Sequence, residues 1–235
     1  MIPIPLNDNV RRHTFWLSTL LLIVVNFWVF LFELSLGPAL NRLIFLYGVI
    51  PARYLSPHGF LMTSPQGALA PLFASMFLHG GWLHLIGNML FLFVFGRSVE
   101  DRFGHLKFLA IYFVSGFLGA ILHIVLNAGS RVPSIGASGC IAGILGAYFV
   151  CFPRARITTV VFLLFFLWTI RLPALVILGY WFLVQFFTGF QMLDIQSATA
   201  GGVAWWIHVG GFIAGMILAL TLKPRGPRVE MIVPY

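Results

Sequence analysis

The clearest structural signal in the sequence is the apolar run TFWLSTLLLIVVNFWVFLFEL at residues 14–34. A helix that crosses a bilayer needs about 20 consecutive, mainly apolar residues, and this run has that length. It follows a polar segment that ends in Arg11-Arg12-His13, and no small-residue cleavage site follows Leu34. Because a secretory signal peptide would have a shorter apolar core and such a site, we expect residues 14–34 to be a retained membrane helix.

The composition of the whole chain points to the same medium. Of its 235 residues, 60% are hydrophobic and 9% are charged, whereas soluble domains carry about 25% charged residues. So few charges cannot solvate the surface of a soluble domain, and we therefore predict a protein embedded in the lipid bilayer. The 14 Lys and Arg exceed the 6 Asp and Glu, but they stand singly between apolar runs. Without a basic patch or helix, we expect no nucleic-acid partner.

Apolar runs predict six spans, at residues 14–34, 83–96, 106–126, 138–152, 172–190 and 202–222. Residues 35–81 are rich in Pro, Gly and aromatic side chains, and we expect them to form an interfacial, partly helical first loop. Residues 157–170 are also apolar enough to span the bilayer. Pro153 before them and Arg171-Leu172-Pro173 after them favour a re-entrant or interfacial segment instead.

The basic residues test this topology through the positive-inside rule. With the N-terminus inside, eleven basic side chains lie on the cytoplasmic side and three lie outside. The cytoplasmic set is Arg11, Arg12, Arg97, Arg102, Lys107, Arg154, Arg156, Arg171, Lys223, Arg225 and Arg228, and the outer set is Arg42, Arg53 and Arg131. A seventh span at residues 157–170 would leave seven on each side. We therefore predict an all-α, six-transmembrane-helix bundle at residues 14–222, with cytoplasmic tails at residues 1–13 and 223–235. In a bacterium it would lie in the plasma or inner membrane.

The two cysteines, Cys140 and Cys151, stand eleven residues apart on one predicted helix. At about 1.5 Å per residue they are roughly 16 Å apart, which is too far for a disulfide. No predicted span carries a His, Glu or Asp cluster with the spacing of metal ligands. We therefore expect neither a metal nor another cofactor.

Ser138 is the first of four candidate residues, because polar groups inside spans are costly and mark function or a helix contact. It stands in Gly136-Ala137-Ser138-Gly139 at the start of the fourth span. Alone, this motif is a weak signal, since Ser and Gly also let membrane helices pack closely. The helix from Ser138 to Pro153 is only about 22 Å long against a bilayer core of roughly 30 Å, so Ser138 would lie below the outer surface, under a water-filled dip. A hydroxyl at a helix N-terminus is well placed there as a nucleophile, because exposed N–H groups stabilise an oxyanion.

His208 in the sixth span is the second candidate. At helical spacing it shares one face with Gly211 and Gly215, and the fourth span carries a matching stripe of small residues from Ser138 to Gly146. If these faces pack together, the imidazole comes within hydrogen-bond range of the hydroxyl and can act as its general base. The alternative is a buried histidine with a structural role.

His84 and Asn88 stand four residues apart, so they project from one face of the second span. Two donors aimed at one point are what an oxyanion hole requires. The alternative is a hydrogen bond between helices that fixes their packing. His79, just before this span, and His123, in the third, have no such partner, and we interpret both as structural or interfacial.

At these residues the sequence resembles the rhomboid family of intramembrane serine proteases. The motifs Gly136–Gly139, His84–Asn88 and His208–Gly215 occur in that family's order and on its fourth, second and sixth spans, and the resemblance covers roughly Pro71 to Leu222. It implies that Ser138 is the nucleophile and His208 its general base, in a dyad without a carboxylate. It also implies that His84, Asn88 and the Ser138 N–H form the oxyanion hole.

Three further positions are compared with that family. The stretch Gly96-x-x-x-Glu100-x-x-x-Gly104 resembles its cytoplasmic turn, to which we assign a structural role. Many members carry an aromatic residue one turn after the serine, where it packs against the histidine, but this chain has Ala142. The family's Trp-Arg pair in the first loop has no clear match within residues 35–81.

The resemblance implies acyl transfer to Ser138 from a peptide carbonyl of a substrate helix that has unwound near the outer leaflet. The partners it implies are membrane proteins with a single span, small residues at the cut and helix-weakening residues nearby. Two alternatives remain: a proteolytically inactive relative that binds membrane clients, and a transporter or channel. The presence of both Ser138 and His208 weighs against the first, and polar residues confined to the outer half of the membrane weigh against the second.

Overall fold

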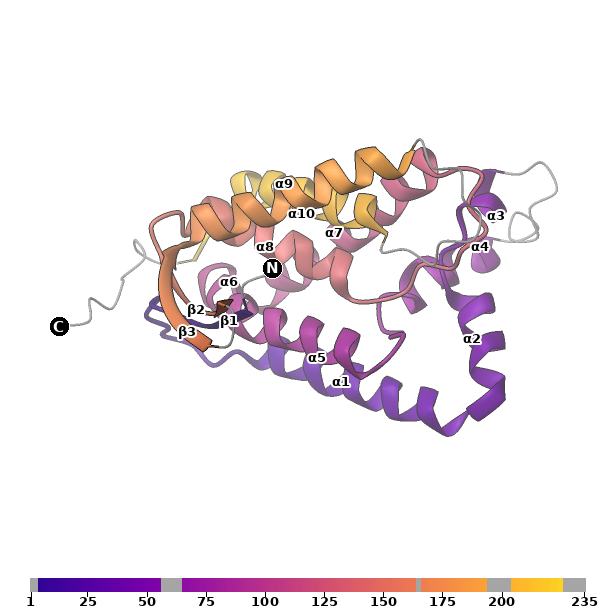
Figure 1. Ribbon diagram of the computed structural model, residues 1–235, viewed down its shortest axis with the longest axis horizontal. Helices are drawn as coiled ribbons and strands as arrows, with labels where there is room; N and C mark the ends of the chain where they lie inside the picture. The colour runs from indigo at the N-terminus through magenta and orange to yellow at the C-terminus, as the bar shows by residue number, and fades with distance from the viewer. Residues whose placement is uncertain (1–3, 56–64, 164–165, 194–203, 226–235) are drawn as a thin grey trace.

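The apolar runs of the sequence form long helices that lie side by side in a computed structural model, which describes residues 4–55, 65–163, 166–193 and 204–225 (Figure 1). In chain order the apolar helices are α1 (Leu17–Ser35), the continuous segment Trp82–Phe103, α7 (His105–Leu126), α8 (Ser138–Cys151), α9 (Ala174–Leu193) and α10 (Trp205–Thr221). Among the described residues, four helices are long and apolar enough to cross a membrane, whereas α8 and α10 are apolar but shorter, with 14 and 17 residues. The predicted class, a helical polytopic membrane protein, is confirmed.

The second span continues beyond its predicted end at Gly96. Helix α5 (Trp82–Phe91) passes through a π-helical turn, η3 (Leu92–Gly96), into α6 (Arg97–Phe103). The prediction ended where charged residues begin, but the Arg97 side chain turns back to donate to the Phe93 carbonyl at 2.6 Å. The helix ends only at Gly104, whose φ of 74° lies in the left-handed region.

Glu100 joins this segment to the N-terminus of α1. Its carboxylate is fully buried and accepts hydrogen bonds from the backbone N–H groups of Ser18 and Thr19, at 2.7 and 2.8 Å. The Thr19 hydroxyl and His105 Nδ1 bond the same carboxylate, each at 2.6 Å. Glu100 therefore caps α1, since the first N–H groups of a helix have no partner within it.

The first loop is partly helical, as predicted, in its described residues. It contains η1 (Gly37–Ala39), α2 (Leu40–Tyr47), α3 (Pro51–Leu55) and α4 (Pro65–Ala74), while residues 56–64 lie outside the described residues. Helices α2, α3 and α4 gather at one end of the molecule, on the right in Figure 1.

A small β-sheet stands at the other end, and the all-α prediction missed it. The described residues between 157 and 170 lie in two antiparallel strands, β2 (Arg156–Leu163) and β3 (Phe166–Pro173), in which Ile157 pairs with Leu172. Strand β1 (Ile4–Asp8), inside the segment that we interpreted as a tail, pairs with the free edge of β2. The β-branched and aromatic residues of this stretch favour strands, and hydropathy alone does not distinguish an apolar hairpin from an apolar helix. Of the other predicted tail, only residues 223–225 are described.

Glycines bring α8 and α10 into backbone contact. A Cβ atom on Gly215 would overlap the Gly143 carbonyl, one on Gly211 would overlap the Gly139 carbonyl, and one on Gly146 would overlap the Phe212 carbonyl. Such small-residue faces let membrane helices approach closely. The two predicted glycine faces therefore meet, and this contact sets the distance between Ser138 and His208.

Candidate active site

Ser138 is the first residue of α8 and is half-buried. The backbone before it folds back into the molecule: the Ser134 N–H donates to the Val49 carbonyl at 2.8 Å, and the Val49 N–H donates to the Ser134 carbonyl at 2.9 Å. The Gly136 N–H donates to the Ser75 carbonyl at 2.8 Å. This irregular segment is thus bonded to other parts of the protein, as backbone at membrane depth must be.

Gly136 needs to be glycine for two reasons. Its φ of 126° is one that other residues rarely adopt. A Cβ atom at this position would also lie 2.7 Å from His84 Nε2. The close passage of the chain past His84 brings the N-terminus of α8, with its outward-facing N–H groups, against the second span.

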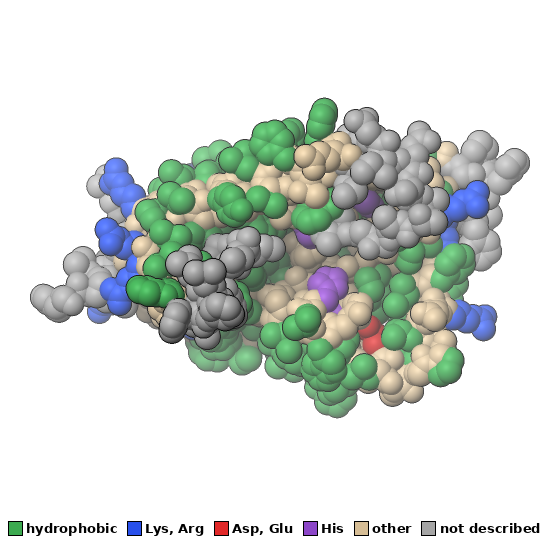
Figure 2. All heavy atoms as spheres, in the orientation of Figure 1, with side chains coloured by type: hydrophobic (Ala, Val, Ile, Leu, Met, Phe, Trp, Pro, Cys, Tyr) green, Lys and Arg blue, Asp and Glu red, His purple; other side chains and the backbone are tan. Residues whose placement is uncertain are grey.

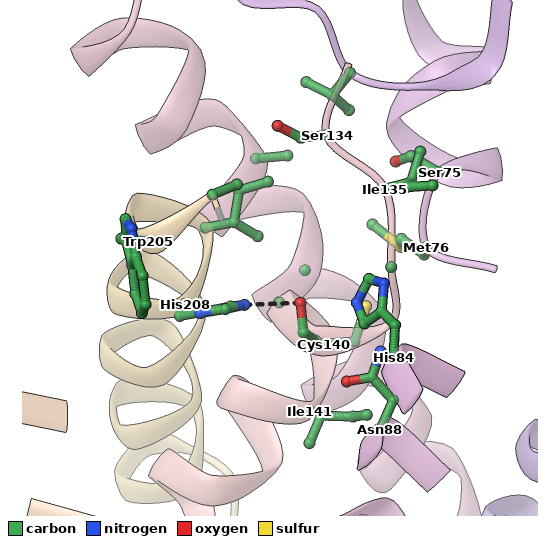
Figure 3. Close-up of a pocket in the computed structure, with 18 of the residues that line it drawn as sticks. Ser75, Met76, His84, Asn88, Ser134, Ile135, Cys140, Ile141, Trp205 and His208 are labelled. Carbon is green, nitrogen blue, oxygen red and sulfur yellow. Dashed lines mark hydrogen bonds between the residues drawn. The ribbon is translucent and has the colours of Figure 1, made fainter. Parts of the chain in front are cut away.

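His208 lies across from this N-terminus on α10, and its Nε2 atom is 2.7 Å from Ser138 Oγ, the dashed line in Figure 3. The imidazole is 8% exposed. Its other nitrogen, Nδ1, is 2.7 Å from the amide oxygen of Gln185 on α9. Because an amide oxygen only accepts, Nδ1 carries the proton and the lone pair on Nε2 faces the serine hydroxyl.

His84 and Asn88 lie on the opposite side of this hydrogen bond from His208 (Figure 3). The backbone N–H of Gly80 donates to His84 Nδ1 at 3.4 Å, which leaves the proton on Nε2, the atom that faces Gly136. A Cβ atom on Gly136 would also lie 3.6 Å from Asn88 Nδ2. Both predicted donors therefore converge beside the start of α8.

Asn88 has a second partner that the sequence did not reveal. Its Nδ2 atom donates to His79 Nε2 at 3.0 Å, and His79 Nδ1 donates to the Phe77 carbonyl at 3.1 Å. The backbone N–H of His79 is held in turn by the buried Glu33 carboxylate of α1. The interpretation of His79 as a residue without such a partner is therefore wrong. An amide nitrogen has two hydrogens, so one remains for the site.

His123 takes part in a separate contact near the end of α7. Its Nε2 atom is 3.1 Å from Ser134 Oγ, and its Nδ1 atom is 3.1 Å from Asn127 Nδ2. These bonds fasten the segment that leads into α8. A structural place for His123 agrees with the interpretation from the sequence, but the expectation that it has no partner is wrong, because Asn127 stands four residues away and bonds it.

A cavity of about 730 Å³ connects the two sides of the site. Its walls are mainly apolar, with Met76, Leu83, Trp181 and Ile207 among the lining residues, and Ser138, His208, His84 and Asn88 supply polar groups. Histidine side chains are visible at a hollow between apolar surfaces in Figure 2. Among the described residues, no three His, Cys, Asp or Glu side chains are grouped so that they could hold a metal ion.

The fold and the site together define a class: a polytopic helical membrane protein with a serine–histidine pair inside a cavity between its helices. Comparison with known families makes the assignment specific, because the model of the rhomboid domain matches residues 66–225. The chain belongs to the rhomboid family.

Individual relatives agree with this assignment. The chain is 31% identical over 163 residues to RHOMBOID-like protein 5 of Arabidopsis thaliana, which covers 68% of this chain and 46% of the relative. It is 33% identical over 158 residues to the rhomboid protease GluP of Bacillus subtilis, covering 67% of this chain and 27% of the relative. It is 32% identical over 114 residues to the mitochondrial rhomboid protein 1 of Saccharomyces cerevisiae, covering 47% of this chain and 33% of the relative. The chain thus spans less than half the length of these relatives.

Proposed function

We propose that the protein is an intramembrane serine endopeptidase that cleaves transmembrane segments of membrane-protein substrates through Ser138 and His208. The observation that carries this proposal is the 2.7 Å contact between Ser138 Oγ and the unprotonated His208 Nε2, two residues that line a cavity. A hydroxyl bonded to a positioned base is the arrangement that activates a serine nucleophile. The similarity to a relative named as a protease supports the same reaction.

The reaction begins when Ser138 Oγ attacks the carbonyl carbon of a substrate peptide bond. The hydroxyl proton passes to His208 Nε2, which is already in hydrogen-bond contact with it. The electron pair of the carbonyl double bond moves to oxygen and gives a tetrahedral oxyanion. The tetrahedral intermediate collapses when the C–N bond breaks, and the leaving amine takes the proton from His208.

The oxyanion would lie between the start of α8 and the second span. The donors on that side are the Ser138 N–H, His84 Nε2 and the free hydrogen of Asn88 Nδ2. The positive end of the α8 dipole points to the same place. Because these donors are held in position before the reaction, they stabilise the charge that develops in the transition state.

Hydrolysis of the acyl-enzyme completes the cycle. A water molecule in the cavity loses a proton to His208 Nε2 while its oxygen attacks the ester carbonyl, and Ser138 leaves with that proton. The new carboxyl end and the earlier amine are the two products. All the proton transfers use one nitrogen of one imidazole.

The substrate would be a membrane-spanning segment that enters the cavity from the bilayer. Carbonyls in an intact helix are hydrogen-bonded and covered, so the segment must unwind before Ser138 can reach one. Single-span proteins with small residues at the cut and helix-weakening residues nearby fit this requirement.

We infer that both termini face the cytoplasm. Basic side chains lie at the two ends of the molecule with an apolar band between them (Figure 2). At the end that carries the sheet, Arg102 donates to the Arg225 carbonyl and Lys107 to the Lys223 carbonyl, so basic residues distant in sequence meet there. The positive-inside rule assigns this richer end to the cytoplasm, and the cavity then opens on the opposite side.

Cleavage in proteoliposomes tests the proposal. A single-span substrate tagged at both ends should be cut by the wild-type protein within or beside its membrane segment, and mass spectrometry of the fragments locates the bond. Ser138→Ala protein of equal thermal stability should leave it intact. Cleavage by Ser138→Ala at the wild-type rate would refute the serine mechanism. Stable capture of the uncut substrate by the wild-type protein would favour a client-binding role.

A further inference from the structure

Gln185 on α9 contacts His208 on the side away from the serine. Its amide oxygen is 2.7 Å from His208 Nδ1, and its side chain is buried, at 3% exposure, in the middle of a mainly apolar helix. Polar groups inside membrane spans are rare and are retained for a helix contact or for function. We propose that Gln185 is the positioning residue of the catalytic histidine, so that Ser138, His208 and Gln185 form one hydrogen-bonded triad. This inference rests on the proposed function.

The contact selects one tautomer of the imidazole. A neutral imidazole with its proton on Nε2 would turn an N–H toward Ser138 Oγ and could not accept the hydroxyl proton. The Gln185 oxygen has lone pairs only, so it favours the tautomer with the proton on Nδ1. The base that Ser138 needs is therefore present before any substrate arrives.

The support for His208 comes from α9 and α10, and none of it comes from the side chain one turn after Ser138 on α8. The residue one turn after Ser138 is Ala142, which is fully buried and has no ring to place against the imidazole. The rings that lie beside His208 are those of Trp181 and Trp205, at centroid distances of 5.9 and 6.4 Å. Trp181 and Gln185 are four residues apart on α9, so one helix face holds the imidazole by ring contact and by hydrogen bond.

A neutral amide suits this environment better than a carboxylate. Among the described residues, those that line the cavity include no Asp or Glu. An ionised group buried between apolar side chains loses its hydration, and only close pairing compensates for that loss. The Gln185 carbonyl dipole orients the imidazole without this penalty, and its oxygen also faces the N–H that becomes more positive when Nε2 takes the serine proton.

Three variants of α9 test this role in the purified full-length protein. Gln185→Met keeps the length of the side chain and removes the acceptor. Gln185→Glu restores an acceptor oxygen in either protonation state. Leu183→Met is the matched control, because Leu183 is 51% exposed on the outer face of the same helix. Each is compared with wild type by kcat and KM on a single-span substrate, by thermal unfolding in detergent, and by 15N NMR of the histidine nitrogens at alkaline pH.

We expect Gln185→Met to lower kcat on the order of tenfold, because fewer molecules then carry the Nε2 lone pair and the protonated imidazole loses an acceptor. KM should stay near that of wild type, and the unfolding temperature should fall by no more than the loss of one buried hydrogen bond explains. Gln185→Glu should regain most of the lost kcat, and Leu183→Met should match wild type. In the NMR spectrum, His208 should change from the Nδ1-protonated tautomer to a mixture in Gln185→Met.

Two results would overturn the positioning role. One is wild-type kcat and an unchanged His208 tautomer in Gln185→Met. The other is a loss of activity that follows a fall in unfolding temperature and that Gln185→Glu does not repair. If the wild-type protein cleaves nothing, the proposed function fails, but the tautomer measurement still decides the role of Gln185 because it needs no turnover.

Discussion

Asn88 is the residue at which a catalytic role and a packing role separate most clearly. One hydrogen of its Nδ2 is bonded to His79 Nε2 at 3.0 Å, and the other is free to point toward the start of α8. Asn88→Ala removes both. The first bond contributes to stability in the ground state, whereas in the proposed mechanism the second hydrogen contributes only when an oxyanion forms.

The two contributions differ in size. Loss of one donor from an oxyanion hole typically costs about 2.7–4 kcal/mol, a hundredfold or more in rate. A hydrogen bond between membrane helices is worth only about 0.6 kcal/mol on average. Because His84 and the Ser138 N–H remain and water enters the cavity, we expect Asn88→Ala to lower kcat at least tenfold. KM and the unfolding temperature should change little, since charge stabilised only in the transition state does not affect substrate binding.

His79→Leu is the matched control, because it breaks the same His79–Asn88 bond while the Asn88 side chain stays in place. Steady-state cleavage of a single-span substrate and thermal unfolding are measured for both variants in the same detergent. His79→Leu should shift the unfolding temperature as much as Asn88→Ala but reduce kcat by a clearly smaller factor. Equal kcat losses in the two variants, or an Asn88→Ala protein that melts early yet turns over normally when kept cold, would make Asn88 a packing residue.

Three other perturbations follow from the fold. Gly215→Val places a side chain against the Gly143 backbone. This overpacking should lower the free energy of unfolding by about 1–3 kcal/mol and reduce both the unfolding temperature and the activity. An unchanged unfolding temperature would contradict the contact between α8 and α10. Glu100→Leu leaves two α1 backbone N–H groups and the Thr19 hydroxyl without their acceptor. Each loss should lower the free energy of unfolding by about 1–3 kcal/mol, which thermal unfolding detects, while kcat of the folded fraction stays within a few-fold of wild type. In sealed cells, with both native cysteines replaced, an impermeant maleimide should label a cysteine at position 130 and spare one at position 223, in place of Ser130 and Lys223; the reverse pattern refutes the proposed orientation.

Much of the fold could be predicted because a bilayer imposes a length on apolar runs. The predicted start of the third span at residue 106 and of the fourth at Ser138 each lie within one residue of the observed helix start. The predicted second span ends at Gly96, but the helix continues past Arg97, whose side chain packs over Phe93, 3.7 Å from the ring centroid. The paired strands β2 and β3 were not predicted because hydropathy does not distinguish apolar strands from an apolar helix, and strand β1, which completes the sheet, comes from a distant part of the chain.

Some residues of the candidate site could be predicted from short sequence motifs, whereas others are identified only by contacts between helices. Ser138, His208, His84 and Asn88 stand in motifs that are read within a few residues, so the sequence singles them out. The bond from Gln185 to His208 crosses between two helices, 23 residues apart in sequence. Its only local signal is an amide side chain in the middle of the apolar run from residue 174 to residue 193, which also carries Gln191 near its end, so the sequence alone does not single out Gln185. Contacts of this kind depend on how the helices rotate against one another, and periodicity does not specify that rotation.

The central claim is that Ser138 is a nucleophile activated by His208, and covalent labelling tests it most directly. A fluorophosphonate probe forms a phosphorus–oxygen bond with an activated serine, releases fluoride and transfers the hydroxyl proton to the base, so it requires no substrate. Wild-type protein in detergent should carry one label, located at Ser138 by mass spectrometry. Ser138→Ala and His208→Ala proteins with normal unfolding temperatures should carry none. Labelling of Ser138→Ala protein, or labelling of Ser138 at the wild-type rate in His208→Ala protein, would contradict the account.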